Sequence, residues 1–484
     1  MVNNCVLKGL KPEGVFEFFG EILSVPRPSK HEGKMTEFLL NWAKQRGLEH
    51  ERDAIGNVII RKGATKGMEN KPWVCLQAHI DMVCEKNGDK CFDFMKDAIE
   101  PRIENGWLMA SGTTLGADDG IGVATALAVL DAKDVVHGPI ECLFTVDEET
   151  GLSGANALSP TALKSRILLN LDSEDEGEMF IGCAGGVDTL AKLPFEREDT
   201  PRGAYFRISV KGLKGGHSGD DINKGLGCAN KLLNRILWEA DKEMDMRLAC
   251  FNGGNLRNAI AREAYAEVVV TEQEAEDLRR LVEKFSGDLK YEFRSTEPNM
   301  QITLESIAKP AFVVDMLSQD NLLNVLYACP HGVLAMSREI PNFVETSTNL
   351  ASVKTEENHF FITTSQRSSV ESAKVAAASR VESCFLLAGA DVEHTDGYPG
   401  WAPNTDSHVL KVAVEAYKKL FGKEPVVRAI HAGLECGLIG EKYENMDMIS
   451  YGPTLRGVHS PEERLEIATV DLFWRHTLEI LKNI

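Results

Sequence analysis

Short apolar runs alternate with helical patterns over the first 185 residues, and this order limits the folds open to the chain. The expected strands are NVIIRK, VCLQAHIDMV, IECLFTVDEE and RILLNLDSE, and the expected helices are GVFEFFGEILSV, HEGKMTEFLLNWAKQRG and IGVATALAVLDA. Strands that alternate with helices build a mostly parallel sheet flanked by helices. We therefore expect an α/β domain in this part of the chain.

The pattern changes near residue 185 and returns near residue 395. Between these points AYFRISVKGLKGGHSG and EAYAEVVV alternate like strands, CANKLLNRILWEA is helical, and a similar α+β order recurs up to DVEHTD. A chain of 484 residues is too long for one ordinary core. We predict one α/β domain from residues 1–185 and 395–484, and an inserted α+β domain from 186–394 with ferredoxin-like elements, whose doubling is a hypothesis.

Charge and cysteine usage restrict the partners and the compartment. The formal net charge of −20 argues against nucleic acid or an anionic membrane as a partner. No apolar run approaches the length of a membrane span. The eleven cysteines have no CxxC pair, and the start MVNNCVLKGLKPEG has no apolar signal region. We expect a cytoplasmic enzyme or binding protein.

The run VCLQAHIDMV carries a possible ligand and its support. His79 and Asp81 are two apart on the expected strand, so both side chains project from one face. A carboxylate in that position can hold the imidazole tautomer and orientation that metal binding requires. Alone, such a pair is more often structural than metal-binding.

Further acids and a histidine follow the other expected elements. They are Asp118 and Asp119 in GADDGIG, Glu148 and Glu149 in TVDEETG, Asp172 in NLDSEDEGE, and His459 in YGPTLRGVHS. Each has a structural explanation by itself: a helix N-cap for Asp118 and Asp119, a solvated turn for the glutamates, a surface acidic loop for Asp172, and an ordinary loop residue for the histidine. Together they lie at strand ends of one α/β domain, where open sheets bind ligands.

This set of residues favours metal chemistry over other catalytic classes. The chain has no GxSxG, P-loop, HExxH or GxGxxG motif. Two histidines and three carboxylates, with one carboxylate bridging, would complete a site for two zinc-like ions. Two divalent cations would also offset the repulsion among the acids of TVDEETG.

The order of these motifs resembles the M20 family of metallopeptidases over nearly the whole chain. The matching motifs are AHIDMV, GADDGIG, DEETG, NLDSE, GGHSG and VHSPEE. PRPSKHEGK, DAIGNVIIRK and HAGLECGLIG resemble the aminoacyl-histidine dipeptidase branch of that family. The resemblance implies a catalytic di-metal domain made of both chain ends, with the inserted domain as a lid.

The resemblance also implies roles for the metal-site residues. His79, Asp118 and Asp172 resemble the ligands of one metal, and Asp118, Glu149 and His459 those of the second. Asp118 rather than Asp119 bridges, because the first aspartate of the pair bridges in the family. Glu148 matches the general base, and Asp81 the residue that buttresses His79.

Three further residues match positions outside the metal site. His217 in GGHSG resembles the lid histidine that stabilises the oxyanion. Asn258 and Arg367 match positions that bind the substrate backbone and its carboxylate, although their flanking residues depart from the commoner patterns. Arg367 would otherwise be interpreted as a surface arginine at a strand end.

The activity implied is hydrolysis of Xaa-His and other unblocked dipeptides, carnosine included, by a metal-activated water with Glu148 as base. The cofactors implied are two divalent ions, zinc first, with manganese or cobalt as alternatives. The resemblance leaves monomer and homodimer open, and with them the subunit that His217 serves. The competing interpretations are an N-acyl amino acid deacylase, an aminopeptidase on short peptides, and a non-catalytic binding protein.

Overall fold

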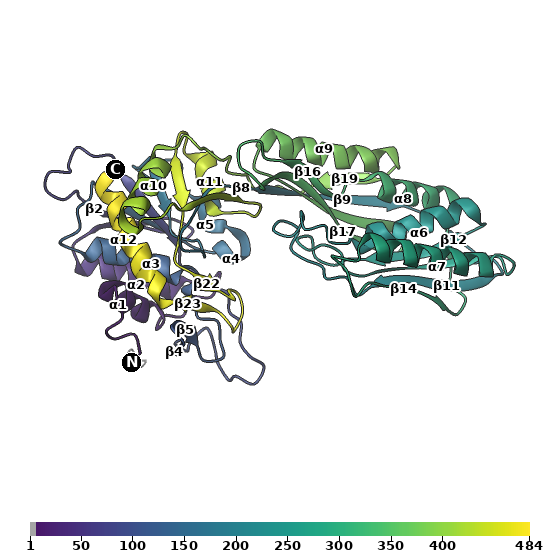
Figure 1. Ribbon diagram of the computed structural model, residues 1–484, viewed down its shortest axis with the longest axis horizontal. Helices are drawn as coiled ribbons and strands as arrows, with labels where there is room; N and C mark the ends of the chain where they lie inside the picture. Colours follow the sequence, from purple (N-terminus) through teal and green to yellow (C-terminus); the bar gives the residue numbers. More distant parts are fainter. Residues whose placement is uncertain (1–5) are drawn as a thin grey trace. The chain divides into compact units, whose positions relative to one another are not determined.

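The structure is a computed structural model that describes residues 6–484. It divides into two compact units, shown in Figure 1. The first unit holds the chain up to Gly182 together with Pro403–Ala429 and Leu434–Ile484, and the second holds Cys183–Ala402 and Ile430–Gly433. No helix in the described part of the chain is long and apolar enough to cross a membrane.

The first unit is built on an eight-stranded sheet. In spatial order its strands are β1 (Glu49–Arg52), β2 (Val58–Lys62), β6 (Ile140–Thr145), β3 (Val74–His79), β7 (Ile167–Asn170), β21 (Asp447–Ser450), β8 (Glu178–Cys183) and β20 (Val426–Ile430). The four strands β6, β3, β7 and β21 are parallel neighbours, and antiparallel strands flank them. Since their residues are almost all buried, these central strands are covered on both faces.

Helices and a small second sheet complete the first unit. The helices are α1 (Glu13–Ile22), α2 (Gly33–Gln45), α3 (Ala117–Asp131), α4 (Glu148–Gly151), α5 (Ser153–Ala157), α10 (His408–Phe421), α11 (Glu435–Lys442) and α12 (Ile467–Asn483). The small sheet has the order β22 (Leu455–Arg456), β23 (Arg464–Glu466), β5 (Trp107–Ala110), β4 (Pro101–Glu104). Helix α3 is nearly all buried and packs on β3, as its continuous apolar sequence predicts.

The second unit is built on a nine-stranded sheet. Its strands are β14 (Gln301–Ser306), β11 (Ala204–Lys211), β13 (Ala264–Val270), β12 (Arg247–Gly253), β17 (Val344–Thr355), β18 (His359–Ser368), β9 (Gly185–Pro194) and β19 (Asp391–His394), with β16 (Gly332–Met336) beside β17. The two short strands β10 (Arg197–Glu198) and β15 (Val313–Val314) pair separately. The helices are α6 (Ala229–Glu243), α7 (Ala275–Glu292), α8 (Met316–Ala328) and α9 (Glu371–Leu387).

The large sheet consists of two ferredoxin-like halves. Along the chain the first half runs β11, α6, β12, β13, α7, β14, and its strands lie in the order 4-1-3-2. The second half runs β9, α8, β17, β18, α9, β19 with the same order reversed, and the first half is inserted after β9. The halves join where β12 pairs with β17. The expected ferredoxin-like elements are therefore present twice.

One layer of helices covers one face of this sheet. Neighbours α7, α6, α8 and α9 contact each other in that order and pack on strands of both halves (Figure 1). Side chains that alternate along β11 separate the two faces, since Phe206, Ile208 and Val210 join the core under the helices. Ser209 and Lys211 point to the other face.

The expected α/β class with an inserted α+β part is confirmed, and the four central strands of the sheet pair in parallel. One local expectation is wrong. Strand β3 ends at His79, so Asp81 does not lie on the strand. The guanidinium of Arg27 instead takes the carbonyl oxygens of Ile80 and Asp81, at 3.1 and 2.6 Å, which diverts these backbone groups from the ladder.

Candidate metal centre

The carboxyl ends of three neighbouring parallel strands carry most of the predicted ligands. β3 ends on His79, β6 is followed by Glu148 and Glu149 in α4, and Asp172 lies two residues past β7. Because β6, β3 and β7 are parallel and adjacent, these ends lie at one edge of the sheet. The edge therefore collects one imidazole and three carboxyl groups.

Asp118, at the start of α3, joins the two predicted ligand sets. Its Oδ1 lies 3.0 Å from His79 Nε2, and its Oδ2 lies 3.1 Å from His459 Nε2. His79 Nε2 is also 3.6 Å from Asp172 Oδ1, and His459 Nε2 is 2.9 Å from Glu149 Oε2. The structure thus brings all five predicted ligands together, with one oxygen of Asp118 facing each histidine.

The neighbouring Asp119 belongs to neither of the two predicted ligand groups. Its Oδ1 accepts a hydrogen bond from the backbone N–H of Gly122 at 3.1 Å, inside the first turn of α3. The helix-capping role considered for the aspartate pair therefore belongs to Asp119. Asp118 therefore contributes its carboxylate to the cluster, and Asp119 caps the helix.

Asp81 ties the histidine to the glutamate turn although it lies beyond the strand. Its fully buried carboxylate accepts the backbone N–H groups of Glu148 at 3.0 Å and Glu149 at 3.2 Å, and the hydroxyl of Ser29 at 2.8 Å. Its Oδ1 lies 3.3 Å from Nδ1 of His79. One carboxylate thereby fixes both the imidazole and the backbone that carries Glu148 and Glu149.

Sequence reasoning missed Glu463, which orders the loop before Asp118. Its buried carboxylate accepts the backbone N–H groups of Leu115, Gly116, Ala117 and Asp118 at 2.7, 2.9, 2.7 and 3.3 Å. Glu463 follows His459 by four residues, so it joins the loops of both. The acidic pair in VHSPEE was the available signal, but burial of the second acid is not visible in the sequence.

Glu463→Ala is expected to lower the free energy of unfolding by about 3 kcal/mol or more, because it leaves three buried N–H groups and one part-buried N–H group without their acceptor. Urea unfolding followed by circular dichroism measures the change. Glu462→Ala is the matched control, since this neighbouring acid is exposed. Equal urea midpoints for the two variants would contradict the assignment.

The charges in the cluster depend strongly on one another. Burial opposes charge on His79, but Asp172, Asp118 and Asp81 outweigh it and raise the pKa of His79 well above its usual value. Hydrogen bonds to Asp118 and Glu149 raise the pKa of His459 to about 11. Both imidazoles therefore hold protons that a metal ion would displace.

Burial acts in the opposite sense on the carboxyl groups. It raises the pKa of Asp172 to about 7 and the pKa of Glu148 well above its usual value. Among the described residues, no lysine or arginine lies within ion-pair distance of Asp118, Glu148, Glu149 or Asp172. The cluster is a desolvated group of acids whose cationic partners, among the described residues, are the imidazoles of His79 and His459.

These residues fit a pair of divalent cations. Two groups, one of His79, Asp118 and Asp172 and one of Asp118, Glu149 and His459, each place their ligand atoms within 4.8 Å of one another. Oε1 of Glu149 is buried and has no hydrogen-bond partner among the described atoms. Imidazole nitrogens and carboxylate oxygens are common ligands of zinc and related ions.

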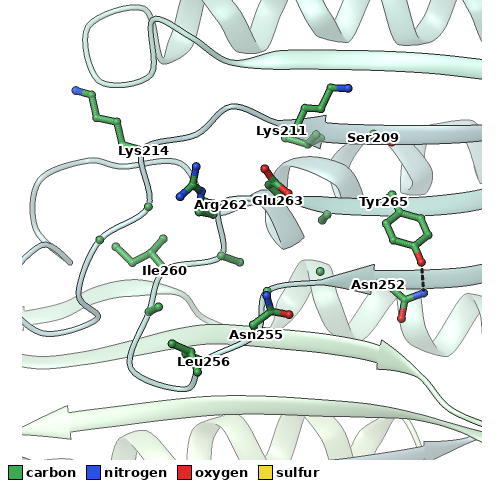
Figure 2. A pocket seen from close by; sticks show the side chains of 18 of the residues that line it. Ser209, Lys211, Lys214, Asn252, Asn255, Leu256, Ile260, Arg262, Glu263 and Tyr265 are labelled. Atoms are coloured by element: carbon green, nitrogen blue, oxygen red, sulfur yellow. Dashed lines mark hydrogen bonds between the residues drawn. The ribbon is translucent and has the colours of Figure 1, made fainter. Parts of the chain in front are cut away.

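The three remaining predicted residues lie in the second unit. His217 and Asn258 line a cavity of about 890 Å³ on the sheet face opposite the helices. Their loops are joined by the Ser218 N–H, which donates to the Asn258 carbonyl oxygen at 2.8 Å. Figure 2 shows Lys214 and Arg262 at one end of this cavity and Tyr265 on β13 at the other.

Arg367 on β18 is buried, with 7% of its side chain exposed, rather than an exposed surface arginine. Its Nη1 donates to the hydroxyl of Tyr398 at 3.0 Å, and its Nε has no hydrogen-bond partner among the described atoms. His217 and Arg367 both act electrostatically on Asp220, so the two predicted residues belong to one charged neighbourhood of this unit. Asn258 is exposed in its loop.

A model of the peptidase family M20/M25/M40 matches residues 75–481. The chain belongs to this family. This M20 peptidase is 46% identical over 479 residues, 99% of either chain, to the cytosol non-specific dipeptidase of Escherichia coli K12. The predicted family and its aminoacyl-histidine dipeptidase branch are thereby confirmed, and the chain is a hydrolase of the peptidase class.

Solved structures agree with the assignment to M20. The crystal structure of aminoacylhistidine dipeptidase from Vibrio alginolyticus matches with a TM-score of 0.93 and 45% identity, over 99% of this chain and 98% of that one. The aminopeptidase PepT of Bacillus cereus matches with a TM-score of 0.57 and 18% identity, over 98% of each chain. The second match shows a shared fold alone.

Proposed function

We propose that this M20 peptidase is a metal-dependent dipeptidase that hydrolyses Xaa-His and other unblocked dipeptides. The observation that carries the proposal is the position of Asp118, whose two carboxylate oxygens each face a different histidine. This arrangement supports a bridging carboxylate between two metal ions. His79 and Asp172 would complete one metal site, and Glu149 and His459 the other.

When bound, two divalent cations would lower the pKa of a water and polarise the scissile carbonyl. Glu148 is our candidate to receive the proton. Its carboxylate lies within 4.8 Å of ligand atoms of His79 and Glu149, and its backbone N–H is held by Asp81. Because burial raises the pKa of Glu148 and so favours its protonated form, Glu148 would take a proton from that water and later deliver it to the leaving amine.

The residues of the second unit would recognise the peptide. We assign Arg367 to the substrate carboxylate, since a guanidinium can form two parallel hydrogen bonds with it. Asn258 is assigned to the peptide backbone and His217 to the oxyanion of the transition state. In this proposal the first unit is the catalytic domain and the second is the lid.

A dipeptide panel tests the proposed substrate. Apo-protein is reconstituted with Zn²⁺, Mn²⁺ or Co²⁺ and assayed with Xaa-His dipeptides, carnosine, other dipeptides, tripeptides and N-acetyl amino acids. We expect free-amine dipeptides to be hydrolysed at least about tenfold faster than N-acetyl amino acids, and apo-protein to be inactive. The E. coli and Vibrio relatives, both dipeptidases by name, support this expectation.

The same panel separates the alternatives. Preferred hydrolysis of N-acetyl amino acids would identify a deacylase, and preferred cleavage of tripeptides would identify an aminopeptidase. Metal binding without turnover of any substrate would indicate a binding protein. Zinc as the native ion is part of the proposal, and metal analysis of protein purified without added metal tests it.

The cytoplasm is the proposed compartment. Cys75, Cys142, Cys228 and Cys329 are buried free thiols, which suits a reducing environment. Peptides, rather than nucleic acid or membranes, are the proposed partners of this acidic chain. Homodimer formation stays a prediction, and light scattering of the purified protein would test it.

A further inference from the structure

A group of four polar side chains lies buried directly behind the proposed metal ligands. Gln77 on β3, Thr145 on β6 and Asn170 on β7 are fully buried, and Glu435 at the start of α11 is 1% exposed. The interior of a parallel sheet is normally apolar, and an unsatisfied polar group there costs free energy. Four such groups in one place therefore need a reason.

The four side chains form one continuous set of hydrogen bonds. Nε2 of Gln77 donates to Oε2 of Glu435 at 2.6 Å, and the hydroxyl of Thr145 donates to the same oxygen at 2.7 Å. Nδ2 of Asn170 donates to Oε1 of Gln77 at 2.6 Å. These hydrogen bonds thus connect the neighbouring strands β6, β3 and β7 with helix α11, which lies more than 250 residues later in the sequence.

The carboxylate fixes the direction of every bond in this set. Oε2 of Glu435 accepts from both Gln77 and Thr145, so the Gln77 amide turns its NH₂ toward Glu435 and its oxygen toward Asn170. Asn170 then presents its own Oδ1 to the backbone N–H of Asp172, 3.4 Å away. The hydrogen bonds therefore run in one direction from the backbone N–H of Asp172, a proposed ligand, through Asn170 and Gln77 to Glu435.

Each member lies close in sequence to a proposed site residue. Gln77 precedes His79 by two residues, Asn170 precedes Asp172 by two, and Thr145 precedes Glu148 by three. The strand register pairs Gln77 with Asn170 and His79 with Thr145. A change in the hydrogen-bonded set would therefore shift the strand ends that carry the ligands.

We infer that Glu435, through Gln77, Thr145 and Asn170, is a positioning residue that fixes the relative places of the metal ligands on β3 and β7 and of Glu148 after β6. The inference rests on the proposed metal-dependent function. Glu435 belongs to the HAGLECGLIG motif, for which the proposed reaction has no other use. It acts through its neighbours, because its side chain is buried and accepts its hydrogen bonds from Gln77 and Thr145 rather than from a proposed ligand.

Metal affinity tests the inference without reference to turnover. Apo-protein is titrated with Zn²⁺ in competition with a chromophoric chelator. Glu435→Leu is expected to raise the dissociation constant of at least one ion about 10- to 100-fold, the usual effect of losing support behind a ligand. Glu435→Gln keeps an acceptor oxygen for Gln77 and Thr145, so it is expected to stay within about threefold of wild type.

If Glu435→Leu does not fold, two less disruptive variants, Thr145→Val and Thr125→Val, test the positioning role. Thr145→Val removes one donor from the set and is expected to weaken Zn²⁺ binding about fivefold. Thr125→Val is the matched control, because this equally buried hydroxyl bonds only to the Ile121 carbonyl within α3. Equal affinities for these two variants would overturn the inference.

Two further results have separate meanings. If Glu435→Gln weakens binding as much as Glu435→Leu, charge rather than hydrogen-bond direction is the cause, and the positioning role is overturned. Folded Glu435→Leu with wild-type affinity for both ions also overturns it. If the wild-type protein itself binds no Zn²⁺, the proposed function fails, which is distinguishable from a failure confined to the variants.

Discussion

Glu148→Ala is expected to lower kcat by about 10²- to 10⁴-fold while both metal ions remain bound, because proton transfer by a placed base contributes about that much. Glu148 lies within 4.8 Å of ligand atoms of His79 and Glu149, but among the described residues it forms no ion pair with a histidine, as Asp118 and Glu149 do. Steady-state kinetics on a dipeptide, together with metal content by atomic emission, measures both quantities.

Glu149→Ala is the matched comparison for this prediction. Glu149 follows Glu148 directly, and its Oε2 faces His459 at 2.9 Å. Its loss is expected to release one metal ion as well as activity. Full hydrolysis by Glu148→Ala with normal metal content would refute the proposed base.

Asp118→Ala is expected to raise the dissociation constants of both metal ions by about 100-fold or more and to abolish hydrolysis. The single carboxylate contributes one oxygen to each ligand group, so its loss weakens two sites at once. Removal also leaves His79 and His459 without their shared partner. Isothermal titration of apo-protein with Zn²⁺ measures both affinities.

Asp119→Asn is the control, because this side chain accepts the Gly122 N–H and an asparagine oxygen can do the same. Its metal affinities are expected to remain within about threefold of wild type. Loss of only one ion from Asp118→Ala would show that the carboxylate does not bridge. Equal losses in the two variants would show that the loop, rather than the carboxylate, was disturbed.

Much of the fold could be predicted from the spacing of apolar residues and the succession of strands and helices along the chain. The apolar alternation placed β2, β3, β6 and β7 and the buried helix α3, because strands and helices bury side chains at different intervals. The recurrence of an α+β order suggested a doubled insertion, which the two ferredoxin-like halves show. The end of β3 was misplaced, since the hydrogen bonds of Arg27 that divert it come from a distant segment.

In TVDEETG the sequence did not reveal the role of its first acid, Asp147. The notion of a solvated acidic turn fails, because Asp147 is buried and accepts hydrogen bonds from the hydroxyls of Thr150 and Ser153. No role for Asp147 could be argued from the sequence. Its role depends on a turn whose backbone conformation the sequence does not reveal.

The sequence by itself determined the succession of strands and helices along the chain and which acids and histidines follow the strand ends. These residues were expected to meet because parallel strands bring their carboxyl ends to one edge. The choice of Asp118 over Asp119 came from the family resemblance, and in the structure Asp118 faces both histidines. Only the tertiary structure decided that Glu463 and Glu435 hold the ligand-bearing segments. Glu463 bonds residues about 345 positions earlier, and Glu435 bonds one 358 positions earlier. Such bonds depend on the path of the whole chain, which local periodicity does not encode.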